Sequence, residues 1–448
     1  MIIKTDVVIV GAGLSGLYAA HLLQQQGKTV SLLEARERVG GRLDNHQFNN
    51  GDLVDVGGQW IGPGHDGMYA LLKKFGLGFY PLYDKGQHLL WLGKKARRYS
   101  GTIPKLNPVA LIQLGWLMWR FDVMARTLDV NAPWRHKKAK QWDSLTLESW
   151  IRKNSVSKQA RELFRITIGA VFAVECSEIS LLHALIYAQS NKNLDYLISV
   201  TGGAQQDRIH GGSAGLCQQI ADSLGESLHL NSKVSSIHWS NDGVNVKSND
   251  REYEGKKIIL AMPPNQLLRL GFSPALPGVK DQLWQHMPAG SCIKCVAQYA
   301  TPFWRDNNLS GQVVSLQGDL PIRVTFDNTE SGKTAGLLMG FIEGDHARHW
   351  GEKSEQERKQ AVLESFATFF GEQALQPIDY VDRNWANEEF SRGCYSANPT
   401  PGTWTSLGQH LRTRVGPIHF AGTETAENYT GYMEGALNAA QRCVKEVT

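Results

Sequence analysis

Apolar residues near the start of the chain follow two different spacings, which together predict a strand–helix–strand unit. Residues 6–10, DVVIV, form a continuous apolar run, which is typical of a parallel strand buried on both faces. The turn GAGLSG (11–16) follows, and LYAAHLLQQQG (17–27) then places apolar residues at helical spacing. TVSLLEA (29–35) reads as a second buried strand, so the segment has the composition of one βαβ motif.

The same patterns continue through the rest of the chain and predict a mixed α/β fold. Strands are expected in 228–239, 244–248, 256–264, 292–299, 337–342 and 417–425. Helices are expected after residue 216, over about 354–370 and over 431–447. The sequence has no internal repeat or obvious linker, so we expect the domains to be interleaved rather than consecutive.

The stretch 81–200 is different because it is rich in tryptophan and in amphipathic helical patterns. Its clearest example is VALIQLGWLMWRF (109–121). A stripe of large apolar residues at helical spacing packs in the core more often than it forms a ligand site. We therefore expect the tryptophans of this helix to be buried.

Composition and charge narrow the class of protein. The 448 residues favour about two to three domains with a large core, and 42% hydrophobic with 20% charged residues is ordinary for a folded chain. A formal net charge of +4 is too small to indicate nucleic acid or an anionic membrane as a partner. Because we find neither a signal-peptide pattern nor an uncharged run of about 18 residues, we expect a cytoplasmic enzyme without a transmembrane anchor.

The six cysteines are scattered, which is not the pattern of a secreted disulfide framework. Cys292 and Cys295 have C-x-x-C spacing, but they lie in a strand-like run where they would point to opposite faces. The sequence has no second cysteine pair to complete a zinc site, so core thiols are expected and no metal site is predicted.

A glycine motif and an acidic residue predict a dinucleotide site. Gly11 permits a tight turn, Gly13 lets the backbone approach a pyrophosphate, and Gly16 permits close helix–strand packing. The helix N-terminus that follows favours a phosphate. Glu34 ends the second strand, where a carboxylate accepts hydrogen bonds from ribose hydroxyls and repels a 2′-phosphate. The site therefore does not suit NADP.

The residues after Glu34 favour FAD over an exchangeable NAD. In EARERVGGR (34–42), Arg36 and Arg42 accompany a second glycine pair that includes Gly41. Two arginines and two glycine turns suit a pyrophosphate that stays bound.

These motifs, with others spread over nearly the whole chain, resemble the flavin amine oxidase superfamily, and in particular a bacterial monoamine oxidase of the soluble type. The matching segments are GAGLSGLYAA, LLEARERVGGR, DVGGQWIGP, GSCIKCVAQY, NWANEEFSRGCY and FAGTETAENYTGYMEGA. The resemblance implies a Rossmann-like FAD-binding domain of the glutathione-reductase type, interleaved with a substrate domain of a sheet plus helices. It assigns residues 1–80, 208–288 and 390–448 to the FAD domain, and 81–207 and 289–389 to the substrate domain.

The resemblance also implies roles for individual residues. Lys294 matches the lysine that holds a water beside flavin N5, and Tyr395 and Tyr432 match the two aromatic residues that guide the amine to the flavin. Further cofactor contacts are implied at Gly57, Gly58, Gln59, Trp60, Val234, Trp385, Gly422, Thr423, Gly431 and Met433. The substrate pocket is implied at Ala170, Val171, Gln206, Val314, Val324 and Phe341.

The mostly apolar pocket positions imply oxidative deamination of a primary amine with an apolar or aromatic tail, in which O2 is reduced to H2O2. Diamine and polyamine oxidases of the superfamily hold the distal ammonium with an acid, at a position where this chain has Val324. L-Amino-acid oxidases need an arginine soon after the second glycine pair, which GGQWIGPG (57–64) lacks, although Arg208 could replace it. A flavin dehydrogenase or desaturase, and a non-catalytic flavoprotein, stay open as alternatives.

The segment SRGCY (391–395) raises a question about how the cofactor is held. Cys394 aligns with the cysteine that mammalian monoamine oxidases join to the flavin 8α-methyl, whereas many bacterial relatives hold FAD without this link. Arg392 replaces a glycine of the family pattern. Two interpretations stay open, FAD tethered through Cys394 or FAD beside a free thiol. The expected partners are a small amine and O2 rather than nucleic acid, and a homodimer stays open.

Overall fold

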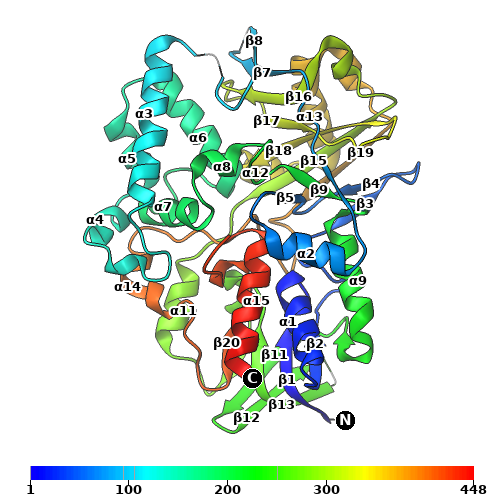
Figure 1. The fold of residues 1–448 in the computed structure, drawn as a ribbon, viewed down its shortest axis with the longest axis vertical. Helices are drawn as coiled ribbons and strands as arrows, with labels where there is room; N and C mark the ends of the chain where they lie inside the picture. Colours follow the sequence, from blue (N-terminus) through cyan, green and yellow to red (C-terminus); the bar gives the residue numbers. More distant parts are fainter. Residues whose placement is uncertain (1, 94, 105, 250) are drawn as a thin grey trace.

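The computed structural model describes residues 2–93, 95–104, 106–249 and 251–448, so Met1 of the expected first domain lies outside the described residues. Two large β-sheets dominate the fold, one in the lower and one in the upper half of Figure 1. Helices cover both sheets, and the mixed α/β class expected from the sequence is confirmed.

The lower sheet has the strand order β10-β2-β1-β13-β12-β11-β14, with β20 also paired to β13. Strands β10, β2, β1, β13 and β20 are parallel, and β12 is antiparallel to both of its neighbours. Their bounds are β1 (Ile2–Val10), β2 (Val30–Leu33), β10 (Leu228–His229), β11 (Val234–Ser240), β12 (Gly243–Ser248), β13 (Arg251–Leu260), β14 (Gly271–Ser273) and β20 (Ile418–Phe420). The sheet thus combines segments from the start, middle and end of the chain, as its blue, green and red parts show in Figure 1.

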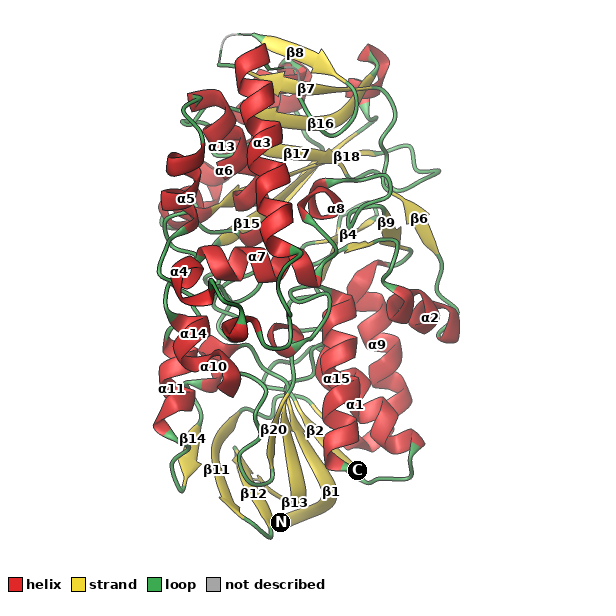
Figure 2. Cartoon of the chain, turned by 60° about the vertical axis from the view of Figure 1, so that its left-hand side comes forward, coloured by secondary structure: helices red, strands yellow, loops and turns green. Residues whose placement is uncertain are grey.

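The first strand is apolar throughout its second half because both of its faces are covered. Val7 and Ile9 pack with the helices α1 (Leu14–Gln25), α9 (Gly212–Leu224) and α15 (Met433–Val447), which lie side by side in Figure 2. Val8 and Val10 face the opposite cluster, to which α11 (Gly278–Gln285) contributes. The strand–helix–strand unit predicted from the first apolar runs is confirmed as β1, α1 and β2.

The upper sheet has the strand order β19-β15-β18-β17-β16-β7-β8. Its strands are β7 (Gln87–Trp91), β8 (Ala96–Tyr99), β15 (Cys292–Tyr299), β16 (Leu309–Ser315), β17 (Val324–Asp327), β18 (Gly336–Glu343) and β19 (Asp379–Asn384). Every residue of β15 is buried, and Cys292 and Cys295 contribute to different core clusters on its two faces. The expectation that these two thiols point apart is therefore confirmed.

Smaller elements complete the fold. The short strands are β3 (Asn45–Gln47), β4 (Leu53–Asp55), β5 (Trp60–Ile61), β6 (Phe79–Pro81) and β9 (Asp207–Ile209). The other helices are α2 (Asp66–Lys74), α3 (Pro108–Ala125), α4 (Ala139–Asp143), α5 (Leu147–Asn154), α6 (Lys158–Phe172), α7 (Leu181–Ser190), α8 (Leu194–Ile198), α10 (Pro264–Leu267), α12 (Gly344–Gly351), α13 (Glu355–Phe370) and α14 (Thr403–Leu407). In the part of the chain that the structure describes, none of the helices combines the length and the hydropathy needed to cross a membrane.

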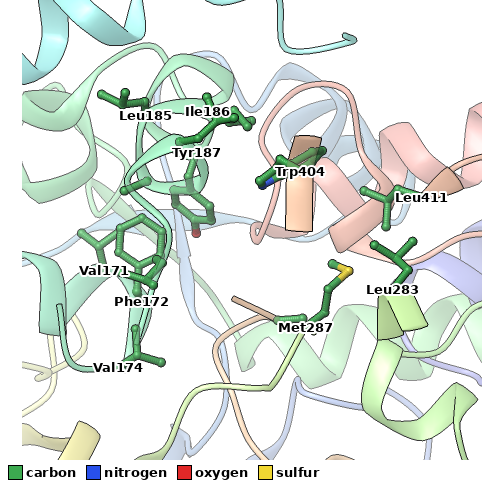
Figure 3. Packing of buried hydrophobic residues seen from close by; sticks show 14 of the residues in the cluster. Val171, Phe172, Val174, Leu185, Ile186, Tyr187, Leu283, Met287, Trp404 and Leu411 are labelled. Atoms are coloured by element: carbon green, nitrogen blue, oxygen red, sulfur yellow. The ribbon is translucent and has the colours of Figure 1, made fainter. Parts of the chain in front are cut away.

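The helices between the two sheets share one large apolar core. Figure 3 shows Phe172 and Val171 of α6 beside Tyr187 of α7, with Trp404 of α14 and Met287 nearby. Burying a side chain of this size stabilises the fold by about 1.5–3 kcal/mol. This core fixes α6 and α7 relative to α14 and to the segment of Met287.

Helix α3 contradicts one expectation from the sequence. Its inner face is buried through Leu117 and Phe121, where it packs on α6 and α7. Trp116 and Trp119, however, keep 46% and 56% of their surface exposed, so the prediction that these tryptophans are core residues is wrong. The reason is that α3 is apolar on nearly all sides, whereas only one side has a packing partner.

Candidate active site

A cavity of about 510 Å3 extends from the carboxyl ends of β1 and β2 to the face of β15. In open parallel sheets, ligands bind at this end of the strands. The cavity brings together most of the residues that the sequence predicted for the cofactor and substrate sites: Gly11, Gly13, Glu34, Arg36, Gly41, Arg42, Gly57, Gly58, Gln59, Trp60, Ala170, Val171, Val234, Lys294, Phe341, Trp385, Cys394, Tyr395, Gly422, Thr423, Gly431, Tyr432 and Met433.

The glycine turn between β1 and α1 is shaped by contacts that exclude a side chain. Gly11 has φ +99°, and a Cβ there would lie 2.7 Å from the carbonyl oxygen of Ala261. A Cβ on Gly16 would lie 1.9 Å from the carbonyl oxygen of Gly11, so only glycine lets α1 approach the strand this closely. At Gly13 a Cβ would have only the oxygen of Gly40 within 4 Å, at 3.9 Å. Gly13 therefore borders open space, as a residue approached by a pyrophosphate should.

Glu34 lies at the end of β2 with its carboxylate buried beside this turn. Its Oε2 accepts a hydrogen bond from the Ala12 amide at 2.8 Å, and its Oε1 accepts one from the Arg36 amide at 3.0 Å. These bonds fix the carboxylate at the cavity wall and leave it lone pairs for the hydroxyls of a ribose.

The two predicted arginines are ion-paired within the protein. The Arg36 guanidinium donates to Glu388 Oε2 at 3.0 Å and to Ser391 Oγ at 2.9 Å. Arg42 donates to both oxygens of Glu424, at 2.6 and 3.0 Å, and to the carbonyl of Tyr395 at 2.8 Å. Through these bonds, Arg36 and Arg42 connect the segment after β2 to the two segments that carry Cys394 and Thr423.

Burial by itself disfavours the charge of Arg42, but the paired carboxylate of Glu424 outweighs this effect and raises the pKa of Arg42. A fully paired cation at the cavity wall keeps its charge at any physiological pH. It can thus anchor the backbone of Tyr395 permanently.

These features fit a bound FAD. The open space at Gly13 and the N-terminus of α1 suit a pyrophosphate, and the buried carboxylate of Glu34 suits a ribose diol. The cavity continues past them to Lys294 and Tyr432, which leaves room for a ring system beyond the dinucleotide.

Lys294 lies on β15 with only 2% of its surface exposed. Its Nζ donates to the carbonyl of Gly57 at 2.9 Å and to Gln59 Oε1 at 2.5 Å. The pKa of Lys294 is lowered to about 7, mainly because burial disfavours its charge; the carboxylate of Asp55 opposes this shift, and the positive charge of Arg208 adds to it. The alternative that this lysine reaches out to solvent is excluded, and its amine can exchange a proton near neutral pH.

Tyr395 and Tyr432 enter the cavity from different segments. The hydroxyl of Tyr395 donates to Glu343 Oε1 at 2.8 Å, and its ring contacts the edge of Phe341 with centroids 5.7 Å apart. Tyr432 immediately precedes α15, and its carbonyl accepts a hydrogen bond from Thr423 at 2.8 Å. The backbone of each tyrosine is thus fixed by a neighbouring segment of the cavity wall.

Glu343, at the end of β18, is a residue that the sequence did not single out. Burial raises the pKa of its carboxyl group to about 7, and the hydrogen bond from Tyr395 opposes that shift. No motif marks this position. A charged residue directly after the apolar run 337–342 was the only available signal.

Cys394 is a buried free thiol that lines the cavity. Its amide donates to the carbonyl of Gly290 at 3.0 Å, and Gly393 before it has φ +128°. Arg392 has φ +53°, in the left-handed region that favours glycine, which explains why the family pattern has a glycine there. The exposed arginine adopts this left-handed conformation in the present chain.

Four predicted residues lie outside the cavity wall. Gly16 packs under the glycine turn; Val314 pairs with Val324 in the upper sheet, and Val324 pairs with Phe341 on the next strand. The side chain of Gln206 bonds to Gly202 and Asp207 instead, and its neighbour Gln205 lines the cavity. A shift of one residue was enough to misplace this glutamine, because Gln205 and Gln206 lie in the turn before β9, where no apolar pattern shows which side chain points inward.

Arg208 does not act as a carboxylate clamp in the cavity. It is buried, its Nη2 pairs with Asp55 Oδ2 at 3.2 Å, and its Nη1 donates to the carbonyl of Asn328 at 2.6 Å. It is not part of the cavity wall formed by the described residues. Arg208 was the candidate to replace the carboxylate-binding arginine of an amino-acid oxidase, but its guanidinium is hydrogen-bonded to Asp55 and Asn328 instead.

A dinucleotide site that continues into a chamber with a buried lysine and two tyrosines is typical of a flavoenzyme of the oxidoreductase class. Comparison with known sequences agrees: residues 14–448 match the model of the flavin containing amine oxidoreductase family. The chain belongs to that family, and it is an FAD-dependent amine oxidase.

Several relatives cover almost the whole chain. A Mycobacterium tuberculosis protein, AofH, whose name places it among the flavin-containing monoamine oxidases, is 40% identical over 99% of this chain and 96% of its own length. Amine oxidase [flavin-containing] B of Sus scrofa is 34% identical over 99% of this chain and 86% of its own length.

Solved structures of similar proteins have the same fold. Putrescine oxidase with putrescine bound superposes with a TM-score of 0.96 at 30% identity, covering 100% of this chain and 99% of that one. Cyclohexylamine oxidase from Brevibacterium oxydans superposes with a TM-score of 0.95 at 30% identity, covering 99% of this chain and 98% of that one.

Proposed function

We propose that this enzyme oxidises a primary amine whose tail is apolar or aromatic. The observation that carries the proposal is the wall of the chamber near Lys294, which apart from the amides of Gln59 and Gln205 is mostly apolar or aromatic: Ala170, Val171, Tyr187, Leu197, Phe341, Tyr395 and Tyr432. Among the described residues that line the cavity, the acids are Glu34 and Glu389, and both lie at the dinucleotide end. An ammonium group at the far end of a diamine would have no carboxylate to pair with there.

The overall reaction consumes the amine, O2 and water, and yields the aldehyde, ammonia and H2O2. Bound FAD supplies the acceptor for the two electrons that the amine loses and passes them to O2. The protein binds the neutral amine, excludes bulk water and orients the α-carbon. Tyr395 and Tyr432 are proposed to flank the amine, because aromatic rings give an amine an apolar surface with a favourable electrostatic face.

We assign to Lys294 the task of holding a water molecule and stabilising negative charge as oxygen is reduced. Its amine is fixed by Gly57 and Gln59, so it costs no reorganisation when charge develops. The depressed pKa of about 7 keeps a large fraction of the amine neutral at physiological pH, which suits a group that both gives and takes a proton.

We further propose that Cys394 forms a thioether with the flavin methyl group. Forming the carbon–sulfur bond removes one hydrogen from the thiol and one from the methyl group, and O2 takes both, as two protons and two electrons in total, to become H2O2. The buried cavity position of Cys394 supports this assignment. So does the solved alanine-to-cysteine mutant of putrescine oxidase, which was made to redesign cofactor binding. Acid-precipitated protein should stay yellow, and a colourless pellet with free FAD in the supernatant would contradict the link.

The division of the chain into an FAD domain (1–80, 208–288 and 390–448) and a substrate domain (81–207 and 289–389) is also a proposal. It is supported by strand membership, because β7, β8 and β15 to β19 make the upper sheet while β1, β2, β10 to β14 and β20 make the lower one.

A panel of amines with coupled detection of H2O2 tests the proposed substrate class. Benzylamine, phenethylamine and long alkylamines should be turned over with much higher kcat/KM than putrescine or an L-amino acid. A preference for putrescine would reject the apolar-tail assignment and favour the diamine alternative. Activity on L-amino acids would require a carboxylate site that Arg208 does not provide.

A further inference from the structure

The outer face of α3 is an exposed apolar stripe. Ile112, Trp116, Trp119 and Val123 follow one another at spacings of four, three and four residues, so they lie on one side of the helix. Ile112 keeps 72% of its surface exposed. In Figure 1 the helix forms the outer edge of the molecule, and in Figure 2, where that side is turned forward, it lies in front.

The stripe is wider than one row of residues. Val109 and Leu111 are also exposed on the same helix, and Val156 in a neighbouring loop keeps 82% of its surface exposed. Gln113 of α3 accepts hydrogen bonds from the Val156 amide and from Ser155, so this loop is fixed beside the helix. We call this set of residues (Val109, Leu111, Ile112, Trp116, Trp119, Val123 and Val156) the apolar stripe. An exposed patch of this kind marks an interaction site in a folded protein.

Trp116 and Trp119 lie beside a cationic side chain, Arg120, so this part of the stripe has both apolar and polar groups. The rings of Trp116 and Trp119 lie 5.0 Å apart, and the guanidinium of Arg120 lies 5.8 Å from the ring of Trp116. Tryptophan with a neighbouring arginine is favoured where an apolar layer meets a polar one, because each side chain can serve both.

A run of positive charge follows the stripe. Arg126 lies just after α3, and RHKKAK (135–140) leads into α4, with exposed side chains at Arg135, Lys137, Lys138 and Lys140. In Figure 1 α4 lies near the lower end of α3. Between residues 120 and 140 the sequence has only two acids, of which Asp122 is half-buried and accepts the Leu194 amide. Although the net charge of the whole chain is small, Arg126 and residues 135–140 thus form a local basic segment.

We propose that the apolar stripe and this basic segment form a surface that docks on an anionic lipid bilayer. The stripe would enter the boundary between headgroups and acyl chains, and the basic segment would lie over the anionic headgroups. The helix lies on the membrane rather than crossing it, in agreement with the absence of a spanning helix among the described residues. A second copy of the chain docked on the same face would bring two basic segments towards each other, whereas an anionic bilayer matches both features. The proposal does not depend on the amine that the enzyme oxidises.

Co-sedimentation of the FAD-loaded enzyme with vesicles tests this surface. One set of vesicles contains phosphatidylcholine alone, and the other contains added phosphatidylglycerol. We expect binding to the anionic vesicles that weakens as salt is added. Replacing two apolar anchors, as in W116S/W119S, should lower the binding constant at least about tenfold. Replacing two cations, as in K137Q/K138Q, should lower it on the order of tenfold.

Ile378→Ser is the matched control, because Ile378, with 63% of its surface exposed, is at least as exposed as Trp116 and Trp119 but lies outside the stripe. It should bind vesicles as the unmodified enzyme does. None of the substituted residues lines the active-site cavity, so all variants should keep amine oxidation. Failure of the unmodified enzyme to sediment with anionic vesicles, or equal binding by W116S/W119S, would overturn the proposal. Dissociation of a dimer by W116S/W119S without any vesicle binding would also overturn it and would assign the stripe to self-association.

Discussion

Lys294 is the residue on which the proposed oxidation chemistry most depends. Its amine is buried, bonded to Gly57 and Gln59, and has a pKa of about 7 because burial disfavours its charge. Lys294→Met should slow reoxidation of the reduced enzyme by about a hundredfold, as expected for removal of one preorganised group. FAD binding should change by less than about threefold, because no contact to the dinucleotide end is lost. Stopped-flow mixing of the reduced enzyme with O2 measures the first quantity.

The chain provides a matched control for that variant. Lys280 is also buried to 2% exposure, its pKa is also lowered to about 7 by burial, and its Nζ donates to the carbonyl of His410 at 2.5 Å, away from the cavity. Lys280→Met should leave reoxidation unchanged. If both variants reoxidise at the same rate, the role assigned to Lys294 is wrong.

Glu343 links stability to pH. Its pKa is raised to about 7 in the folded state, so the folded protein holds this proton more tightly than the unfolded chain does. The stability it contributes is complete below the ordinary glutamate pKa and is lost as pH rises through about 7. Glu343→Gln keeps an acceptor for Tyr395 and cannot ionise. It should therefore be more stable than the unmodified protein above pH about 7, by about 3 kcal/mol, and nearly equal to it in acid.

Urea unfolding of both proteins on the two sides of that pKa measures this difference. A stability gap that is the same at both pH values would contradict the assignment. Sequence could not identify Glu343, because its environment is created by the packing of β18 against the segment of Tyr395. Glu34 could be identified, since its distance from the glycine turn is fixed locally within one βαβ unit.

At the scale of elements, two glycines of the glycine turn have different roles: Gly16 is needed for folding, and Gly13 for cofactor binding. A methyl group on Gly16 would clash with the backbone of Gly11 at 1.9 Å, whereas one on Gly13 would meet only Gly40, at 3.9 Å. Gly16→Ala should therefore destabilise the protein itself, by at least about 1–3 kcal/mol, as overpacked sites do. Gly13→Ala should leave the melting temperature of the FAD-free protein almost unchanged but weaken FAD binding at least about tenfold.

Thermal melts without FAD and a titration with FAD distinguish the two variants. Equal effects of both substitutions on both measurements would show that Gly13 does not border the bound cofactor.

Most strands and helices could be predicted from the apolar pattern, because elements such as the second half of β1 are buried on both faces and leave an unbroken apolar run, VVIV (7–10). The orientation of α3 could not be predicted from that pattern. Its apolar residues surround the helix, and only the packing of α6 and α7 decides which side is covered. The sequence also could not choose between Gln205 and Gln206, because both lie in the turn before β9 and only the folded chain decides which of them faces the cavity.

At the scale of the whole molecule, the cavity lies where two sheets meet and is closed by segments from every part of the chain. The lower sheet supplies the glycine turn and Glu34, and the upper sheet supplies Lys294 and Phe341. Segments near the end of the chain add Cys394, Tyr395 and Tyr432. This arrangement explains why the matching motifs are spread over the whole sequence, since no continuous part could bind the dinucleotide and the amine together.

The most direct test of this account is to mix the purified enzyme with benzylamine or phenethylamine in the absence of oxygen. The account predicts that the visible absorbance of the flavin is bleached, and that admitting air restores the colour with one H2O2 formed for each amine oxidised. A flavin that stays oxidised with every amine of a broad panel would contradict it.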